Sequence, residues 1–344
     1  MRTATPIPIK RRTCVGIIAL GFEQLMKSRV SIALQLGLGT HSEDMEIRSF
    51  ASEQTRRLLE RLAFQVKSTT RSPAAEAVHE LRVAIRRCAQ ALTVFKARFP
   101  RREVKRIRKE LKRILTAAGA VRDFDVLAKV LSRIDSPAAV ALTQQFRTDR
   151  KSQEKVLIAL LKRWSARRTI AKLCNRLDLN VPNPRTGTVE SSARRTLRSL
   201  GKEFFKSGEP AAAGSSAEEL HDFRLVAKKL RYSMELFAPV YRSSLREQIE
   251  QIKEIQSLLG AINDYHTVIA MVSKIREQSK LEAELERSAR RRIRKFQKIW
   301  AERFSGAKQE KHWMEVVDAA GQATRKPVAS AKRVRVLGDL AMKA

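Results

Sequence analysis

Apolar residues recur every three or four positions along most of the chain, which is the spacing of one buried face of a helix. In one such stretch, Leu81, Ile85, Cys88, Leu92 and Phe95 fall on the same side of a helix. No run alternates between apolar and polar residues in the way that a half-buried strand requires. The pattern therefore predicts an all-α fold.

Proline and glycine divide the periodic region into two sets of four helices. The first set is expected at about residues 45–67, 75–98, 101–133 and 137–174. The second set is expected at about residues 189–206, 219–237, 243–276 and 281–304. Between the sets, Pro182, Pro184 and Gly187 prevent a helix from continuing.

This division predicts one helical domain at residues 46–305, built as a duplicated helical bundle of two pseudo-symmetric four-helix units. Repeat one covers about residues 46–174 and repeat two about residues 189–305. Residues 1–45 form an N-terminal extension, and residues 306–344 form a basic C-terminal tail with weak periodicity only around residues 312–320.

The second helix of each set contains the same short string, HELRVAIRR at 79–87 and HDFRLVAKK at 221–229. At about 100° per residue, the histidine and the basic residues three and seven positions after it lie on one side of the helix, opposite the apolar face. In the second copy Arg231 extends this basic stripe and Tyr232 borders it. A basic stripe that is repeated in register with a histidine favours a functional role over a merely solvated basic face.

Composition makes a polyanionic partner the central expectation. The formal net charge is +34 with 43% hydrophobic residues, so the chain has both a core and a large excess of positive charge. Self-repulsion of this size costs stability, and a bound polyanion relieves it. Nucleic acid, inorganic polyphosphate and an anionic membrane surface are the candidates.

Cysteine usage and hydropathy bear on the cellular compartment of the chain and on its association with membranes. Cys14, Cys88 and Cys174 are scattered, which predicts neither a disulfide framework nor a zinc site and is typical of the cytoplasm. No apolar run reaches the roughly 18–20 residues that a transmembrane helix needs. The basic amphipathic segment 286–300 could bind a membrane, but its position as the last bundle helix favours burial of Ile293, Phe296 and Trp300 in the core.

Further basic residues lie at helical spacing on neighbouring helices, where they could engage successive charges of an extended polyanion. These residues are Arg56, Arg57 and Arg61 in the first helix, Lys105, Arg108, Lys109 and Lys112 in the third, and Arg194, Arg195 and Arg198 in the fifth.

The repeated strings resemble those of the conserved histidine α-helical domain, CHAD. The matching pairs are AVHELRVAIRR with LHDFRLVAKKLRYSMELF, and AAGAVRDFDVL with LLGAINDYHTV. The resemblance spans roughly residues 46–305 and implies two pseudo-symmetric helical halves that bind inorganic polyphosphate through basic residues lining a channel between them. Some proteins of this family are found at storage granules, so the resemblance adds association with a granule as one open alternative for a cytoplasmic protein.

The resemblance assigns roles to residues of both repeats. The polyphosphate-binding residues of the two motifs are His79, Arg82, Arg86 and Arg87 in the first, and His221, Arg224, Lys228, Lys229 and Arg231 in the second. Arg122 with Asp123 and Asn263 with Asp264 match the signatures of the third helices, and we expect the two aspartates to orient the basic groups. The chain departs from the family pattern at Ala89, where the first motif often carries another arginine.

Several alternatives remain open. A phosphotransfer enzyme would need a nucleophile, a metal site or a phosphate-cradling glycine loop, and none is evident; we expect no enzyme activity, cofactor or metal. Relatives often carry a catalytic CYTH domain with a Glu-x-Glu-x-Lys strand, but here Glu282, Glu284 and Glu286 alternate within a helical stretch. Nucleic-acid binding is permitted by charge, although no helix-turn-helix is evident and few aromatic residues lie among the basic ones. The sequence does not indicate an oligomeric state.

Overall fold

The computed structural model describes residues 47–166, 173, 175, 188–214, 216–241, 244–275 and 278–319. The chain divides after Asp44 into two units, and every described residue belongs to the second unit. The described residues form α-helices and one short 3-10 helix, with no strand among them, which confirms the all-α prediction. The expected N-terminal extension, most of the expected linker at 175–188 and the end of the basic tail lie outside the described residues.

The bounds of the helices follow the expected order. In the first set they are α2 (Ile47–Arg71), α3 (Ala75–Val94), η1 (Lys96–Arg98), α4 (Arg101–Leu131) and α5 (Pro137–Ala166). In the second set they are α7 (Val189–Ala213), α8 (Ala217–Tyr241), α9 (Arg246–Val272), α10 (Ser279–Arg303) and α11 (Ala307–Ala319).

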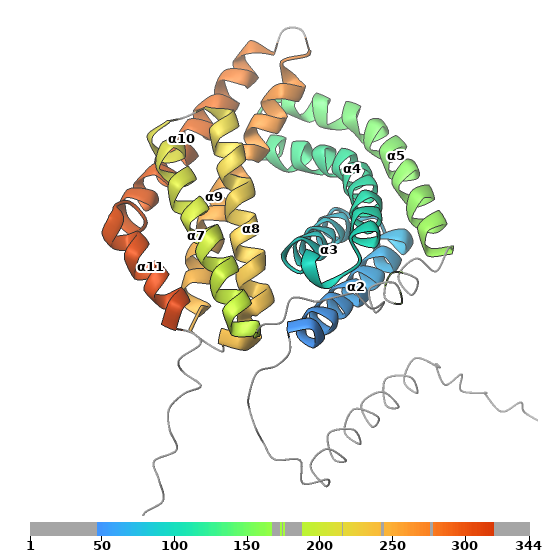
Figure 1. Ribbon diagram of the computed structural model, residues 1–344. Helices are drawn as coiled ribbons and strands as arrows, with labels where there is room; N and C mark the ends of the chain where they lie inside the picture. The colour runs from blue at the N-terminus through green and yellow to red at the C-terminus, as the bar shows by residue number, and fades with distance from the viewer. Residues whose placement is uncertain are drawn as a thin grey trace, which may run out of the picture. The chain divides into compact units, whose positions relative to one another are not determined.

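Each set packs as a bundle in chain order (Figure 1). Helix α2 contacts α3, α3 contacts α4, α4 contacts α5, and α5 returns to α2. The same sequence of contacts links α7, α8, α9 and α10, with α10 returning to α7. Between the sets, α2 contacts α7, α3 contacts α8, and α4 contacts α9. Helices in corresponding positions thus meet, as a duplicated unit would arrange them; the duplication itself remains a prediction.

The hydrophobic core joins the two sets. One cluster of buried side chains draws on helices of both sets, and it includes the expected apolar face of α3 from Leu81 to Phe95. A second cluster packs one end of α4 and of α5 against α9 and α10, and it includes Leu127, Val130, Val268 and Leu285. Because burying one such side chain contributes about 1.5–3 kcal/mol, these contacts hold the two sets together firmly.

Two prolines that were expected to lie between helices lie inside them. Helix α7 continues through Pro210 to Ala213, and α8 continues through Pro239 to Tyr241. A proline removes one backbone hydrogen bond and crowds the preceding turn. Burial of Ala211 and Tyr241 beyond the prolines favours continuation, so tertiary packing overrides the local preference here.

The helical body also runs past residue 305, where the tail was expected to begin. Residues 307–319 form α11, which packs against α7 and buries Trp313, Met314 and Val317. Arg198 of α7 forms an ion pair with Asp318 of α11. The apolar positions are too few for a strong periodic signal, which is why the sequence pattern underrates this helix.

The basic segment 286–300 lies within α10 and contributes to the core. Ile293, Phe296 and Trp300 are buried, as the bundle interpretation expects. Trp300 packs over Gly208 of α7, where a Cβ atom would lie only 1.9 Å from its Cη2 atom, so the close approach of α7 and α10 requires glycine there. No helix in the part of the chain that the structure describes is long and apolar enough to cross a bilayer.

Candidate functional site

Basic side chains from the two sets meet where α3 packs against α8. Helices α3 and α8 are in contact, and each carries one copy of the basic stripe beside its buried apolar face. Interactions among the charges link Arg82 and Arg86 of α3 with Arg224, Lys228 and Arg231 of α8. We call these five residues the central cationic cluster. The repeated motif residues are therefore brought together from both sets.

Partial burial makes this concentration of charge costly. Burial first, and the neighbouring Arg86 guanidinium next, lower the pKa of Arg82 to about 10. Burial and Arg86 likewise lower the pKa of Arg224, and burial lowers that of Arg86. Because several cations lie near one another and partly out of water, the cluster is a region of high positive potential that an anion would stabilise.

The position of Arg82 depends on α4. Its Nη1 atom donates a hydrogen bond to the carbonyl oxygen of Leu115, at 3.2 Å. One turn further along α4, a Cβ atom on Gly119 would lie 2.8 Å from the same Nη1 atom. The guanidinium group therefore occupies space that a side chain at position 119 would take.

Glu235 of α8 neutralises one end of the cluster. Its Oε2 atom accepts hydrogen bonds from Nε and Nη2 of Arg87, at 3.1 and 3.0 Å, and its Oε1 atom lies 3.3 Å from Nη1 of Arg231. The guanidinium of Arg231 also lies over the ring of Tyr232, 4.8 Å from its centroid. A single carboxylate thus holds arginines of both sets, and the Gln90 Nε2 atom donates to Ser233 Oγ beside it, at 2.9 Å.

The rest of the cluster has no such partner. Among the described residues, no carboxylate lies within ion-pair distance of the four remaining cations, which are Arg82, Arg86, Arg224 and Lys228. Unmatched, half-buried cations are unusual because burying a charge costs free energy unless it is paired. The arrangement is suited to an anion that comes from outside the chain.

Asp123 of α4 and Asp264 of α9 flank the cluster at corresponding positions. Burial raises the pKa of both carboxyl groups; Arg82 acts in the opposite direction on Asp123, and Arg224 does so on Asp264. Each aspartate thus faces an arginine of its own set without pairing closely with it. Their expected orienting role remains a prediction.

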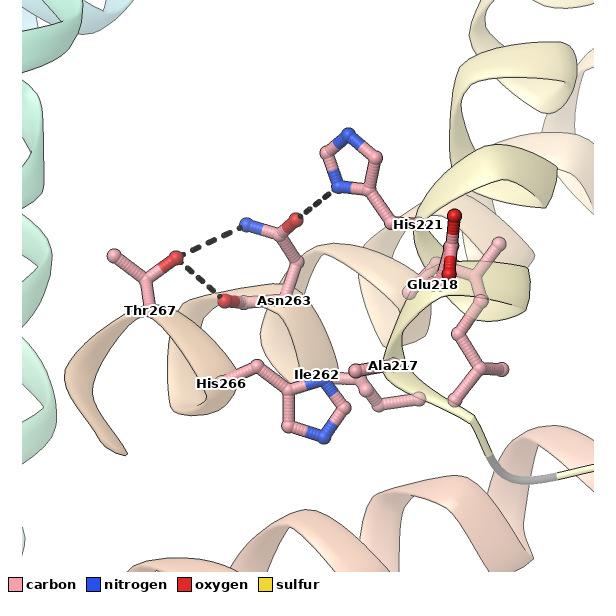
Figure 2. A pocket seen from close by; sticks show the side chains of 9 residues that line it. Ala217, Glu218, His221, Ile262, Asn263, His266 and Thr267 are labelled. Carbon is pink, nitrogen blue, oxygen red and sulfur yellow. Dashed lines mark hydrogen bonds between the residues drawn. The ribbon is translucent and has the colours of Figure 1, made fainter. Parts of the chain in front are cut away.

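The two motif histidines have different surroundings. Burial, and then Arg122, lower the pKa of His79, and Arg86 of the cluster also acts on it, so its ring lies near the cluster. His221 is exposed, and its Nδ1 atom lies 2.8 Å from Oδ1 of Asn263 (Figure 2). Arg122 and Asn263 occupy the same position in the two repeats, so the third helix offers a guanidinium group near His79 and an amide beside His221.

His221 and Asn263 line a cavity of about 340 Å³ between the start of α8 and α9. Figure 2 shows Glu218 and His266 lining the same cavity. None of the five cluster residues lines it, and the carboxylate of Glu218 disfavours a polyanion there. This cavity is therefore separate from the central cationic cluster.

Other basic residues singled out in the sequence lie away from the cluster. Arg57 of α2 pairs with Glu53, with Arg56 beside the same carboxylate. Lys229 points away from the cluster toward Glu203 of α7. Arg198 of α7 pairs with Asp318. Arg194 and Arg195 lie on the same helix, and the extensive contacts of α7 are with helices other than α3.

The basic residues of α4 line a groove of their own. The groove runs between α3 and α4, has a volume of about 790 Å³ and has an apolar floor that includes Ile85 and Ala89. The expected cations along it are Lys105, Arg108, Lys109 and Lys112. Its lining ends at Leu115, the residue whose carbonyl group binds Arg82, so the groove adjoins the cluster.

Two residues that shape the site were not singled out in the sequence. Glu235 lies one turn after Arg231, and an acidic residue four positions after an arginine is a recognisable helix pair. Gly119 stands within the string AAGAVRDFDVL, but nothing in that string shows that a side chain of another helix fills the space beside it.

Comparisons with known proteins agree with the resemblance found in the sequence. The family model described as the CHAD domain matches residues 53–273. The structure is similar to the crystal structure of the CHAD domain from the plant Ricinus communis, with a TM-score of 0.58 and 22% sequence identity, covering 79% of this chain and 92% of that one. It is also similar to PptA from Streptomyces chartreusis, with a TM-score of 0.53 and 16% identity, covering 74% of this chain and 99% of that one. No curated protein sequence matches the chain.

Proposed function

This chain belongs to the CHAD domain family, and we propose that it binds inorganic polyphosphate in the central cationic cluster without changing it chemically. The observation that supports the proposal most is the convergence of unmatched cations from α3 and α8, which are the two helices that contain the repeated motif. The polyphosphate binding that the family resemblance implies points to the same ligand.

The chemistry of the cluster suits a chain of phosphates. A guanidinium group presents a planar set of donors that matches two phosphate oxygens at once. Of the four cluster residues that do not pair with Glu235, three are arginines, namely Arg82, Arg86 and Arg224. Successive phosphates of one flexible polymer could each meet a cation. The bound polymer would also relieve the repulsion among the cations.

Nucleic acid is the second candidate, and one observation weighs against it. The cluster lies half-buried between two packed helices, so a single flexible polymer fits it better than a duplex, whose bases and second strand would have to stay outside. Aromatic rings that could stack on bases are scarce there, since Tyr232 is buried beneath Arg231.

A competition experiment tests the proposal. Long-chain polyphosphate and duplex DNA, matched in phosphate concentration, compete for the labelled full-length chain at physiological ionic strength. We expect polyphosphate to displace a bound probe at a concentration about tenfold lower than DNA, a difference of about 1.4 kcal/mol. The same samples, kept with magnesium, are expected to release no orthophosphate.

The outcomes separate the candidates. Displacement by DNA at equal or lower phosphate concentration would favour the nucleic-acid interpretation. Release of orthophosphate that scales with protein concentration would contradict the non-catalytic part of the proposal.

A further inference from the structure

Lys228 has an unusual position within the central cationic cluster. It is half-buried on α8, and the charges that act on it most are four arginines, Arg224, Arg86, Arg82 and Arg231. Among the described residues, its Nζ atom has neither a hydrogen-bond acceptor nor a carboxylate within ion-pair distance. An ammonium group here would be surrounded by like charge on both helices.

The amine therefore resists protonation in the unliganded protein. Burial first, and then the four arginines, lower the pKa of Lys228 to about 6. At neutral pH the unliganded site thus holds a largely neutral amine among charged guanidinium groups. A phosphate that enters the cluster supplies the missing negative charge, which favours the ammonium form.

Other ionisable groups lie around the cluster. Asp264 on α9 interacts with Lys228 and opposes the positive potential there. His79 on α3 interacts with Arg86, and Arg122 and Asp123 on α4 interact with Arg82. Arg82 stays charged throughout the neutral range, because even its lowered pKa of about 10 lies well above it. His79 lies near the cluster too, and an imidazole can change its charge near neutral pH, so its contribution must be separated from that of Lys228.

We propose that polyphosphate enters the central cationic cluster together with a proton, which the Lys228 amine takes up, so that pH regulates the affinity of the site in the neutral range. The inference rests on the proposed function. Linkage gives its direction: the bound state holds more protons than the free state, so affinity rises as pH falls from alkaline toward weakly acidic values. Once the amine is protonated in the free protein as well, affinity no longer changes through this group.

Calorimetry of the full-length chain measures the proton directly. Long-chain polyphosphate, which has few titrating end groups per phosphate, is added near neutral pH in two buffers that differ in ionisation enthalpy. The difference in heat gives the number of protons taken up per bound segment. We expect the parent to take up close to one proton. As the pH falls from alkaline values toward about 6, binding should become roughly up to tenfold tighter for each pH unit.

Variants assign the proton to a residue. Lys228→Arg supplies a permanent charge and Lys228→Met a neutral chain of similar length, and both are expected to bind without proton uptake. Lys253→Arg, an exposed residue of α9 that pairs with Glu250, is the matched control and is expected to keep the uptake. The His79→Gln variant is expected to keep it too.

Each contrary outcome has a distinct meaning. If the parent binds no polyphosphate, the proposed function fails. If the parent binds polyphosphate without proton uptake, or if the Lys228 variants take up the proton as the parent does, the function stands and the proton inference is wrong. Loss of uptake in His79→Gln alone would assign the proton to that histidine and overturn the role of Lys228.

Discussion

Replacing Arg82 and Arg224 together with alanine is expected to lower the affinity for polyphosphate by roughly 100-fold, or about 3 kcal/mol. The two arginines come from different sets and both belong to the cluster, and neither has a carboxylate within ion-pair distance among the described residues. A hydrogen bond to a charged group contributes about 1.5–3 kcal/mol, so the loss of two contacts gives an effect of this size.

Salt dependence distinguishes lost contacts from lost general charge. By analogy with nucleic acids, the slope of log K against log salt should become shallower by about one for each phosphate contact that is removed. The matched control is Arg147→Ala with Arg290→Ala, which removes the same charge from exposed positions on α5 and α10. We expect the control to bind almost as the parent does.

The same double variant should fold as well as the parent, because it removes repulsion within the cluster. Denaturant unfolding without anion measures this. Equal loss of affinity in the cluster variant and in the control would show that net charge, and not the cluster, determines binding.

The Gly119→Ala variant is expected to weaken polyphosphate binding by roughly tenfold, because it displaces the guanidinium group of Arg82. The added Cβ atom would lie 2.8 Å from Nη1 of Arg82, so the guanidinium group must leave its position and its hydrogen bond to Leu115. Stability should not fall, because alanine favours a helix over glycine by about 0.5–1 kcal/mol and the displaced group is the end of a flexible side chain.

Gly260 provides the control at the corresponding position of α9. A Cβ atom there meets no atom within 4 Å. Gly260→Ala should therefore gain the same helix stability and bind polyphosphate like the parent, in thermal unfolding and in titration. If the two variants bind alike, Gly119 has no part in positioning Arg82.

The helices and their buried faces were predictable because periodicity is a local property. The spacing of Leu81, Ile85 and Cys88 defines one face of α3, and the same residues are buried in the structure. The tendency of proline to interrupt a helix gave helix ends that were too early, before Pro210 and Pro239. Burial of later residues extends both helices. The sequence pattern also underrated α11, whose few apolar residues include the buried Trp313.

The site was predictable in part, for a physical reason. Periodicity shows that Arg82 and Arg86 share a face of α3, but it does not show which helix that face meets. Arg57 and Arg198 have equally regular spacing, yet each pairs with a carboxylate away from α3 and α8. Only the packing of helices from different sets separates the cluster from the other basic stripes.

The crystal structure of the full-length chain with a short polyphosphate would test the central claim most directly. We expect consecutive phosphates to lie within hydrogen-bond distance of Arg82 and Arg86 on α3 and of Arg224 and Lys228 on α8. Phosphates bound only along the exposed face of α4, with none between α3 and α8, would contradict it.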